Sequence, residues 1–127
     1  MTVNFNAYVR DTADNLWRFP RVANADPVES LGVSNANAAD LLAALGLADP
    51  HAEPVPLDVF SNLVTTALRR HLGKRSPAYA SVEDIQPGRM SITYCGRSEG
   101  YIERRLSELA VMTQEARAIG ATHIGWG

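Results

Sequence analysis

Residues 89–127, RMSITYCGRSEGYIERRLSELAVMTQEARAIGATHIGWG, carry the clearest succession of secondary-structure signals in the chain. Alternating residues predict a strand over Arg89–Tyr94, which a tight loop follows. Helical spacing predicts a helix over Glu99–Ile119 that ends at Gly120, and a last strand is expected over Thr122–Trp126. A strand, a helix and a second strand in this order predict a βαβ unit whose crossover is parallel and right-handed.

The helix predicted within this stretch carries its apolar residues in one narrow stripe. Their spacing of four, three, four and three residues is typical of a helix that lies across a sheet or against another helix. The stripe consists of Ile102, Leu106, Leu109, Thr113 and Ala116.

The first strand is predicted near the start of the sequence. Residues Thr2–Arg10 alternate between apolar and polar side chains, as in a strand with one buried face. Turn-forming Asp and Asn residues follow, and Leu16–Phe19 is predicted to return as the second strand of a hairpin. The stretch Val22–Gly32 has no period and is predicted to be a surface loop.

Two further helices are predicted in the middle of the chain. Ser34 and Asn35 are suitable N-cap residues for the first, and Gly46 supplies its stop. The second is predicted over Leu57–Leu72, between a proline-rich linker and Gly73. Its apolar stripe consists of Leu57, Phe60, Val64, Leu68 and Leu72, and Leu63 and Ala67 widen it.

Together these elements predict a single α+β domain over residues 1–127. A chain of this length forms one domain and can bury a core without disulfides. We expect two layers, in which three helices cover a small mixed sheet of three or four strands that ends in the C-terminal βαβ unit. The sheet would contain Val3–Arg10, Met90–Cys95 and Thr122–Trp126.

The composition fits a globular protein and narrows its class. Apolar residues make up 46% and charged residues 20% of the chain, which argues against disorder. Cys95 is the only cysteine, so an intramolecular disulfide and a CxxC site are excluded. The sequence shows neither a signal-peptide pattern nor an apolar run of about 18 residues, so a cytoplasmic protein without a membrane partner is expected.

The loop Cys95–Ser98 joins a predicted strand to the long helix. Amides at a helix N-terminus attract anions, and Gly96, Arg97 and Ser98 would add a close backbone approach, a guanidinium and a hydroxyl. These three residues form a candidate anion- or nucleotide-binding site. The simpler interpretation is favoured: Gly96 makes the turn, Ser98 caps the helix and Cys95 fills a buried strand end.

The charged residues are unevenly distributed, because residues 1–60 carry a net charge of −5 and residues 61–127 carry +3. The densest basic run consists of Arg69, Arg70, Lys74 and Arg75, which could contact nucleic-acid phosphates. Cations at the last turn of a helix also complement its dipole, and no aromatic residues interleave with this run. Nucleic acid is therefore disfavoured as a partner.

The sequence predicts neither a catalytic residue nor a metal or cofactor site. His51, His71 and His123 do not fall at ligand spacing with a carboxylate, and cofactor-binding motifs are absent. Trp17 and Trp126 are candidate interface residues. For Trp126 the favoured alternative is that the ring holds the last strand in the core.

Three short motifs carry a resemblance. They are NAADLLAALG at Asn37–Gly46, YCGRSEGYIERRL at Tyr94–Leu106 and the terminal GWG. With these motifs, the chain from Ser34 onward resembles small proteins of high-GC actinobacteria and their phages, a group without a known activity. The resemblance implies a small soluble accessory protein, of the kind that binds a host protein, and assigns no role to any residue.

Three functions are open at this point. The favoured one is a non-enzymatic protein-interaction or regulatory module that binds another protein, or itself as a homo-oligomer, through a helix face or a sheet edge. The second is an anion- or nucleotide-binding domain that uses the Cys95–Ser98 turn. The third is a nucleic-acid-binding protein that uses Arg69–Arg75.

Overall fold

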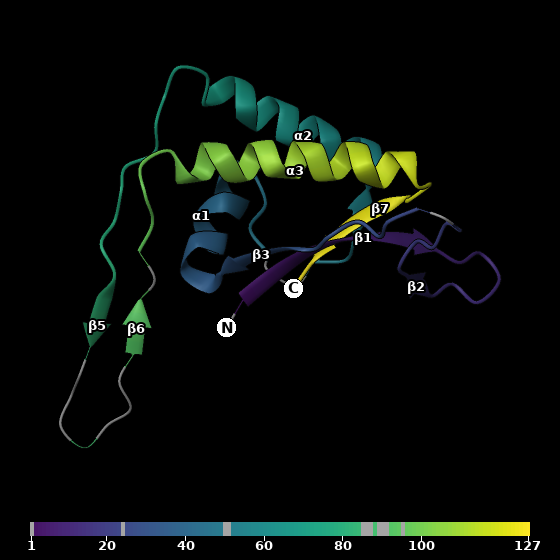
Figure 1. Ribbon diagram of the computed structural model, residues 1–127, viewed down its shortest axis with the longest axis horizontal. Helices are drawn as coiled ribbons and strands as arrows, with labels where there is room; N and C mark the ends of the chain where they lie inside the picture. The colour runs from purple at the N-terminus through teal and green to yellow at the C-terminus, as the bar shows by residue number, and fades with distance from the viewer. Residues whose placement is uncertain (1, 24, 50–51, 85–87, 89–91, 95) are drawn as a thin grey trace.

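The computed structural model (Figure 1) confirms the α+β class. Within the described chain, three helices accompany a five-stranded antiparallel sheet, and a two-stranded sheet stands apart from them. The structure describes residues 2–23, 25–49, 52–84, 88, 92–94 and 96–127. The strands are β1 (Thr2–Arg10), β2 (Trp17–Arg18), β3 (Leu31–Ser34), β4 (Val55–Pro56), β5 (Val82–Asp84), β6 (Ile92–Tyr94) and β7 (His123–Trp126). The helices are α1 (Asn35–Ala44), α2 (Leu57–Arg70) and α3 (Tyr101–Ala118).

Strand β1 lies at the centre of the larger sheet. On one side it pairs with β7, which in turn pairs with β4. On the other side it pairs with β3 along its first half and with β2 at its last residues. All four pairs are antiparallel. The predicted alternation is present, because Val3, Phe5 and Ala7 are buried while the residues between them are less so.

The predicted βαβ unit is wrong in its pairing. Helix α3 separates β6 from β7 in sequence, but β6 pairs with β5 in the smaller sheet, whereas β7 pairs with β1 and β4. The two strands are thus not joined by a parallel crossover, and the larger sheet is antiparallel rather than mixed. The alternation of a strand predicts its buried face and not its partner. Residues 89–91 and 95 of the predicted strand lie outside the described residues.

The helices and the larger sheet form two layers. Helices α2 and α3 lie side by side across one face of the sheet, and α1 packs against α3 and β3 (Figure 1). Phe5 of β1, Phe60 of α2 and Trp126 of β7 meet between the layers, with ring centroids 6.2 to 6.3 Å apart. All three rings are buried, so they anchor the core that both layers share.

Helix α1 begins and ends where the sequence predicts. Ser34 is its N-cap residue, although the hydroxyl makes no capping hydrogen bond. At the other end Gly46 has a φ of 76°, which lies in the left-handed region that favours glycine. The amide of Leu47 then donates to the carbonyl of Leu42 at 2.8 Å, and this completes the predicted Schellman-type stop.

The apolar stripe predicted for α3 is buried, whereas that of α2 is correct only in its first three residues. Helix α2 ends at Arg70, and Leu72 beyond it is 83% exposed. Ala67, which widens the predicted stripe, is buried in the last turns of α2, whereas Leu68 is only partly buried. The buried residues of the α3 stripe are Ile102, Leu106, Leu109, Thr113 and Ala116.

Leu106→Ala is predicted to lower the free energy of unfolding by about 2–5 kcal/mol, because Leu106 is fully buried and its truncation leaves a cavity. Leu72→Ala, at an exposed leucine, should change it by less than about 0.5 kcal/mol. Urea denaturation followed by circular dichroism measures both values. Equal effects of the two substitutions would contradict the buried stripe of α3.

Candidate functional site

Arg97 lies at the base of the arm, by which we mean the segment from Ser76 to Gly100 that carries β5 and β6 and extends away from the helices (Figure 1). The backbones of Arg97 and Tyr79 exchange two hydrogen bonds of 2.8 and 2.9 Å. The guanidinium lies 4.5 Å from the centroid of the Tyr79 ring and donates to Asp40 of α1 at 2.6 Å. With its side chain only 6% exposed, Arg97 joins the arm to α1.

The predicted anion site, Gly96, Arg97 and Ser98, is therefore part of the base of the arm. At Gly96 the backbone of Tyr79 approaches so closely that a Cβ would lie 2.5 Å from the carbonyl oxygen of Tyr79. The Nε of Arg97 is buried and has no hydrogen-bond partner among the described residues, while its Nη1 is occupied by Asp40. Anion binding at this turn stays an untested alternative, and an anion would have to compete with Asp40.

Ser98 does not cap α3, and the prediction that it does is wrong. The N-cap residue is Gly100, two positions later, and a glycine has no side chain that could form a capping hydrogen bond. The Ser98 hydroxyl instead accepts a hydrogen bond from Arg104 at 2.8 Å. Cys95 lies outside the described residues.

A polar cluster around the carboxylate of Glu103 links the end of α2, the arm and α3. Glu103, in the first turn of α3, accepts hydrogen bonds from the amide and the hydroxyl of Ser76 at 2.8 and 2.7 Å. Its carboxylate also lies 3.1 Å from Nδ1 of His71. Burial opposes ionisation of Glu103, but the hydrogen bonds from Ser76 and His71 outweigh it and lower the pKa of Glu103 to about 2. Ser76 and His71 both bind the carboxylate rather than each other, so the cluster does not form a nucleophile–base pair.

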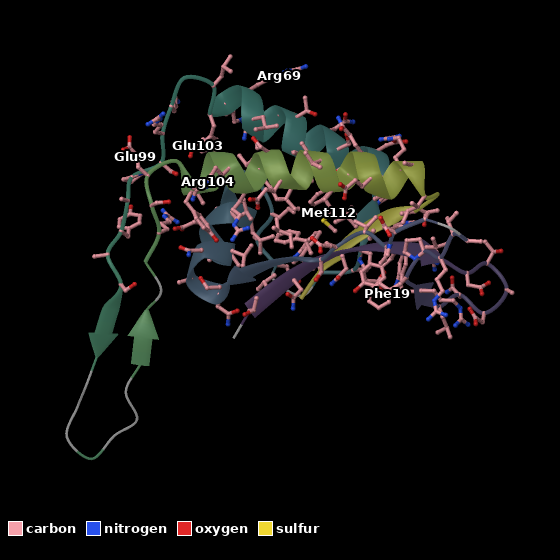
Figure 2. The ribbon with its side chains drawn as sticks, viewed as in Figure 1. Phe19, Arg69, Glu99, Glu103, Arg104 and Met112 are labelled. Atoms are coloured by element: carbon pink, nitrogen blue, oxygen red, sulfur yellow. The ribbon has the colours of Figure 1, made fainter. Side chains whose placement is uncertain are left out.

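The predicted basic run lies at the end of α2 and in the connection to the arm. All four side chains, Arg69, Arg70, Lys74 and Arg75, are exposed. Figure 2 places Arg69 on the side of α2 away from the sheet. Arg69 and Arg70 occupy the last turn of α2, where cations complement the helix dipole. Lys74 and Arg75 lie beyond it, and nucleic-acid binding by this run stays the disfavoured alternative.

The two tryptophans lie in different environments. Trp126 is 6% exposed, and its Nε1 donates to the carbonyl of Asp49 at 2.9 Å, so it belongs to the core. Trp17 of β2 is partly buried on the face of the sheet opposite the helices, next to Tyr8 and His123. Trp17 therefore remains the better interface candidate of the two.

A groove that the sequence analysis did not predict runs between β3 and α3. It has a volume of about 480 Å³. Its apolar lining comes from Leu31 of β3 and from Val111 and Met112 of α3. Val111 is 53% exposed, and Figure 2 shows Met112 on the side of α3 that faces the sheet. The groove thus offers an apolar floor that solvent can reach.

The groove meets an open sheet edge at Leu31, the first residue of β3, and has an acidic rim. Within the described chain β3 pairs with β1 alone, so the backbone groups of Leu31–Ser34 that point away from β1 lack a strand partner. Among the described residues that line the groove, Glu29, Glu108 and Glu115 are acidic and Arg105 is the one cation. Arg105 donates to Glu108 at 2.7 Å, which leaves the rim negatively charged.

The sequence holds only a weak signal for this groove. Val111 is an apolar residue on the otherwise polar face of α3, outside the predicted stripe. The other wall is made by Glu29, Ser30 and Leu31, and the strand that begins at Leu31 is too short to show a period, so that its residues fall partly in the predicted loop and partly at the predicted helix cap.

Three further findings bear on the candidate sites. Among the described residues, His, Cys, Asp and Glu side chains do not come together in groups of three or more that could ligate a metal ion. Over the same residues, none of the helices has both the length and the hydrophobicity of a membrane span. Comparison of the chain with protein-family models, curated proteins and solved structures found no match. Function is therefore inferred from the geometry of the chain itself.

Glu103→Gln is predicted to lower the free energy of unfolding at neutral pH by about 1–3 kcal/mol. The pKa of Glu103 falls from 4.5 to about 2 on folding, so the ionised carboxylate stabilises the fold above pH 4.5. This stabilisation is lost as the pH falls from 4.5 to about 2, because the carboxylate becomes protonated in the folded protein. The difference in unfolding free energy between wild type and variant should therefore shrink from pH 4.5 toward pH 2.

Urea unfolding over this pH range measures the difference, and Glu99→Gln is its matched control. Glu99 is exposed just before the same helix, so its substitution should have little effect at any pH (Figure 2). A Glu103→Gln effect that is independent of pH would contradict the role of the ionised carboxylate.

Proposed function

We propose that this chain is a non-enzymatic protein-interaction module that binds an extended segment of a partner protein along β3. The observation that carries the proposal is the coincidence of an open strand edge with an apolar groove. Strand Leu31–Ser34 offers unpaired backbone groups, and the groove begins at the same Leu31 and continues to α3. Strand addition uses these two features together, because backbone hydrogen bonds supply affinity and side-chain pockets supply specificity.

The lining of the groove defines the chemistry of the segment. Every second side chain of an added strand would point toward the helix layer, where Leu31, Val111 and Met112 form the floor. An aliphatic side chain fits this floor. The carboxylates of Glu29 and Glu115 favour Lys or Arg on either side of that anchor. The proposed partner is therefore a basic segment that contains aliphatic residues.

The acidic rim also favours a different protein over a second copy of this chain. Two copies joined edge to edge by a two-fold axis would place their rims, each with Glu29 and Glu115, next to each other. Like charges in such an interface are repulsive. Self-association through β3 is accordingly an alternative result of the experiment below and is not proposed.

The interaction is tested with a fluorescein-labelled decapeptide of alternating valine and lysine, and its binding is measured by fluorescence anisotropy. Val111→Lys should weaken binding by about tenfold or more, because it places a charge on the apolar floor. Val59→Lys is the matched control, since Val59 is an exposed valine of α2, 48% exposed against 53% for Val111. Val59→Lys adds the same positive charge as Val111→Lys, but at a position outside the groove.

A decapeptide of alternating valine and glutamate should bind at least about tenfold more weakly than the lysine peptide. Equal weakening by Val111→Lys and Val59→Lys would contradict the proposal, because simple charge attraction would then explain the binding. Equal binding of the two peptides, or a concentration-dependent dimer that Val111→Lys abolishes, would also contradict it.

A further inference from the structure

The face of the larger sheet opposite the helices carries a cluster of rings, Tyr8, Trp17, Phe19 and His123, which we call the aromatic face. The rings of Tyr8 and Phe19 stack with centroids 5.3 Å apart and an angle of 21° between planes. Trp17 packs edge-on against His123 at 4.6 Å and against Tyr8 at 6.3 Å. The cluster joins β1, β2 and β7 on the side where the described chain has no helix.

Phe19 is the outermost ring of this cluster. One face of the ring stacks on Tyr8, yet the residue is 63% exposed. Figure 2 shows Phe19 projecting from the sheet on the side away from α2 and α3. A large aromatic ring with one supported face and one solvent-exposed face is a platform on which a second flat ring can stack.

Arginines lie beside the platform. Arg10, Arg18 and Arg21 account for all of the Lys and Arg among residues 1–60, and all three line one cavity of about 380 Å³ together with Phe19 and the acidic residue Asp11. This concentration contrasts with the net charge of −5 of the same sixty residues. The cavity therefore gathers positive charge in an otherwise acidic half of the chain.

Two of these three guanidinium groups are not neutralised. Arg18 forms ion pairs with Asp11 and Asp14. Arg10 donates to the neutral side chain of Asn15 at 2.6 Å and lies 5.4 Å from the centroid of the Trp17 ring. Arg21 is exposed and has no ion pair within the described part of the chain. Burial and the charge of Arg10 both lower the pKa of His123, which disfavours the charged form of this ring.

We propose that the aromatic face binds single-stranded nucleic acid, with one base stacked on Phe19 and the adjacent phosphates bound by Arg10 and Arg21. An exposed ring beside unpaired guanidinium groups matches the repeating unit of a single strand, which alternates a flat base with a phosphate. A duplex keeps its bases stacked on each other and cannot offer one to Phe19. This site is separate from the β3 groove, whose apolar floor lies on the helix side of the sheet.

The test measures binding of a fluorescein-labelled dodecamer of deoxythymidine by fluorescence anisotropy. Phe19→Ala should weaken binding by about tenfold or more. Phe19→Tyr should bind as the wild type does, because it retains an aromatic ring. The double variant Arg10→Ala, Arg21→Ala should weaken binding and also reduce its dependence on salt between about 50 and 200 mM, because phosphate contacts release counterions. A duplex of the same length should bind more weakly than the single strand.

The matched control is Arg69→Ala, Arg70→Ala, which removes the same charge from the basic run at the end of α2. It should leave oligonucleotide binding within about twofold. Loss of binding in this control, with full binding by Phe19→Ala, would move the site to α2 and overturn the proposal. Absence of binding by the wild type would also overturn it. Val111→Lys separates the two proposals, since it should impair peptide binding and spare the oligonucleotide.

Discussion

The antiparallel pairing of β1 with β7 is the interaction on which the rest of the structure depends. It joins residues more than a hundred positions apart, with Phe5 opposite Trp126 and Tyr8 opposite His123. Backbone hydrogen bonds between Asn4 and Gly127, at 2.9 and 3.2 Å, extend the ladder by one further pair. Phe5 and Trp126 from this ladder meet Phe60 of α2 in the core, so the pairing also fixes where the helix layer packs.

Both candidate surfaces follow from the same ladder. Because side chains alternate along a strand, the pairing that directs Phe5 and Trp126 into the core directs Tyr8 and His123 to the opposite face. Those two rings support the aromatic face. Because β7 occupies one side of β1, β3 is left on the other side, where its outer edge stays open beside α3. A surface for stacking and an edge for strand addition are therefore two results of one arrangement.

Sequence patterns predicted the elements whose periods are long enough to read. The nine-residue alternation of β1 and the four-three spacing of α3 identified buried faces that the structure contains. They could not identify strand partners. The predicted βαβ unit therefore pairs β7 with β6, whereas in the structure β7 pairs with β1. Strands β3 and β4 have four and two residues and exist through pairing rather than through any local period.

The same limit applies to the candidate sites. The predicted role of Arg97 did not include Asp40, which lies 57 positions earlier in the chain and occupies its guanidinium. The β3 groove and the aromatic face each combine residues from separate elements, so no single motif could have revealed them. Local signals such as the Gly46 stop were sufficient only where the interaction itself is local.

Native-state hydrogen exchange followed by NMR tests most directly whether the rest of the structure depends on the β1–β7 ladder. Ladder amides of β1 and β7 should exchange only through global unfolding, with the same free energy as the core amides of α3. The β5–β6 arm, a two-stranded sheet that stands apart from the larger one, should exchange through local opening at a much lower free energy. Exchange of β7 amides by local opening while α3 stays protected would contradict the account, because the helix layer would then persist without the ladder.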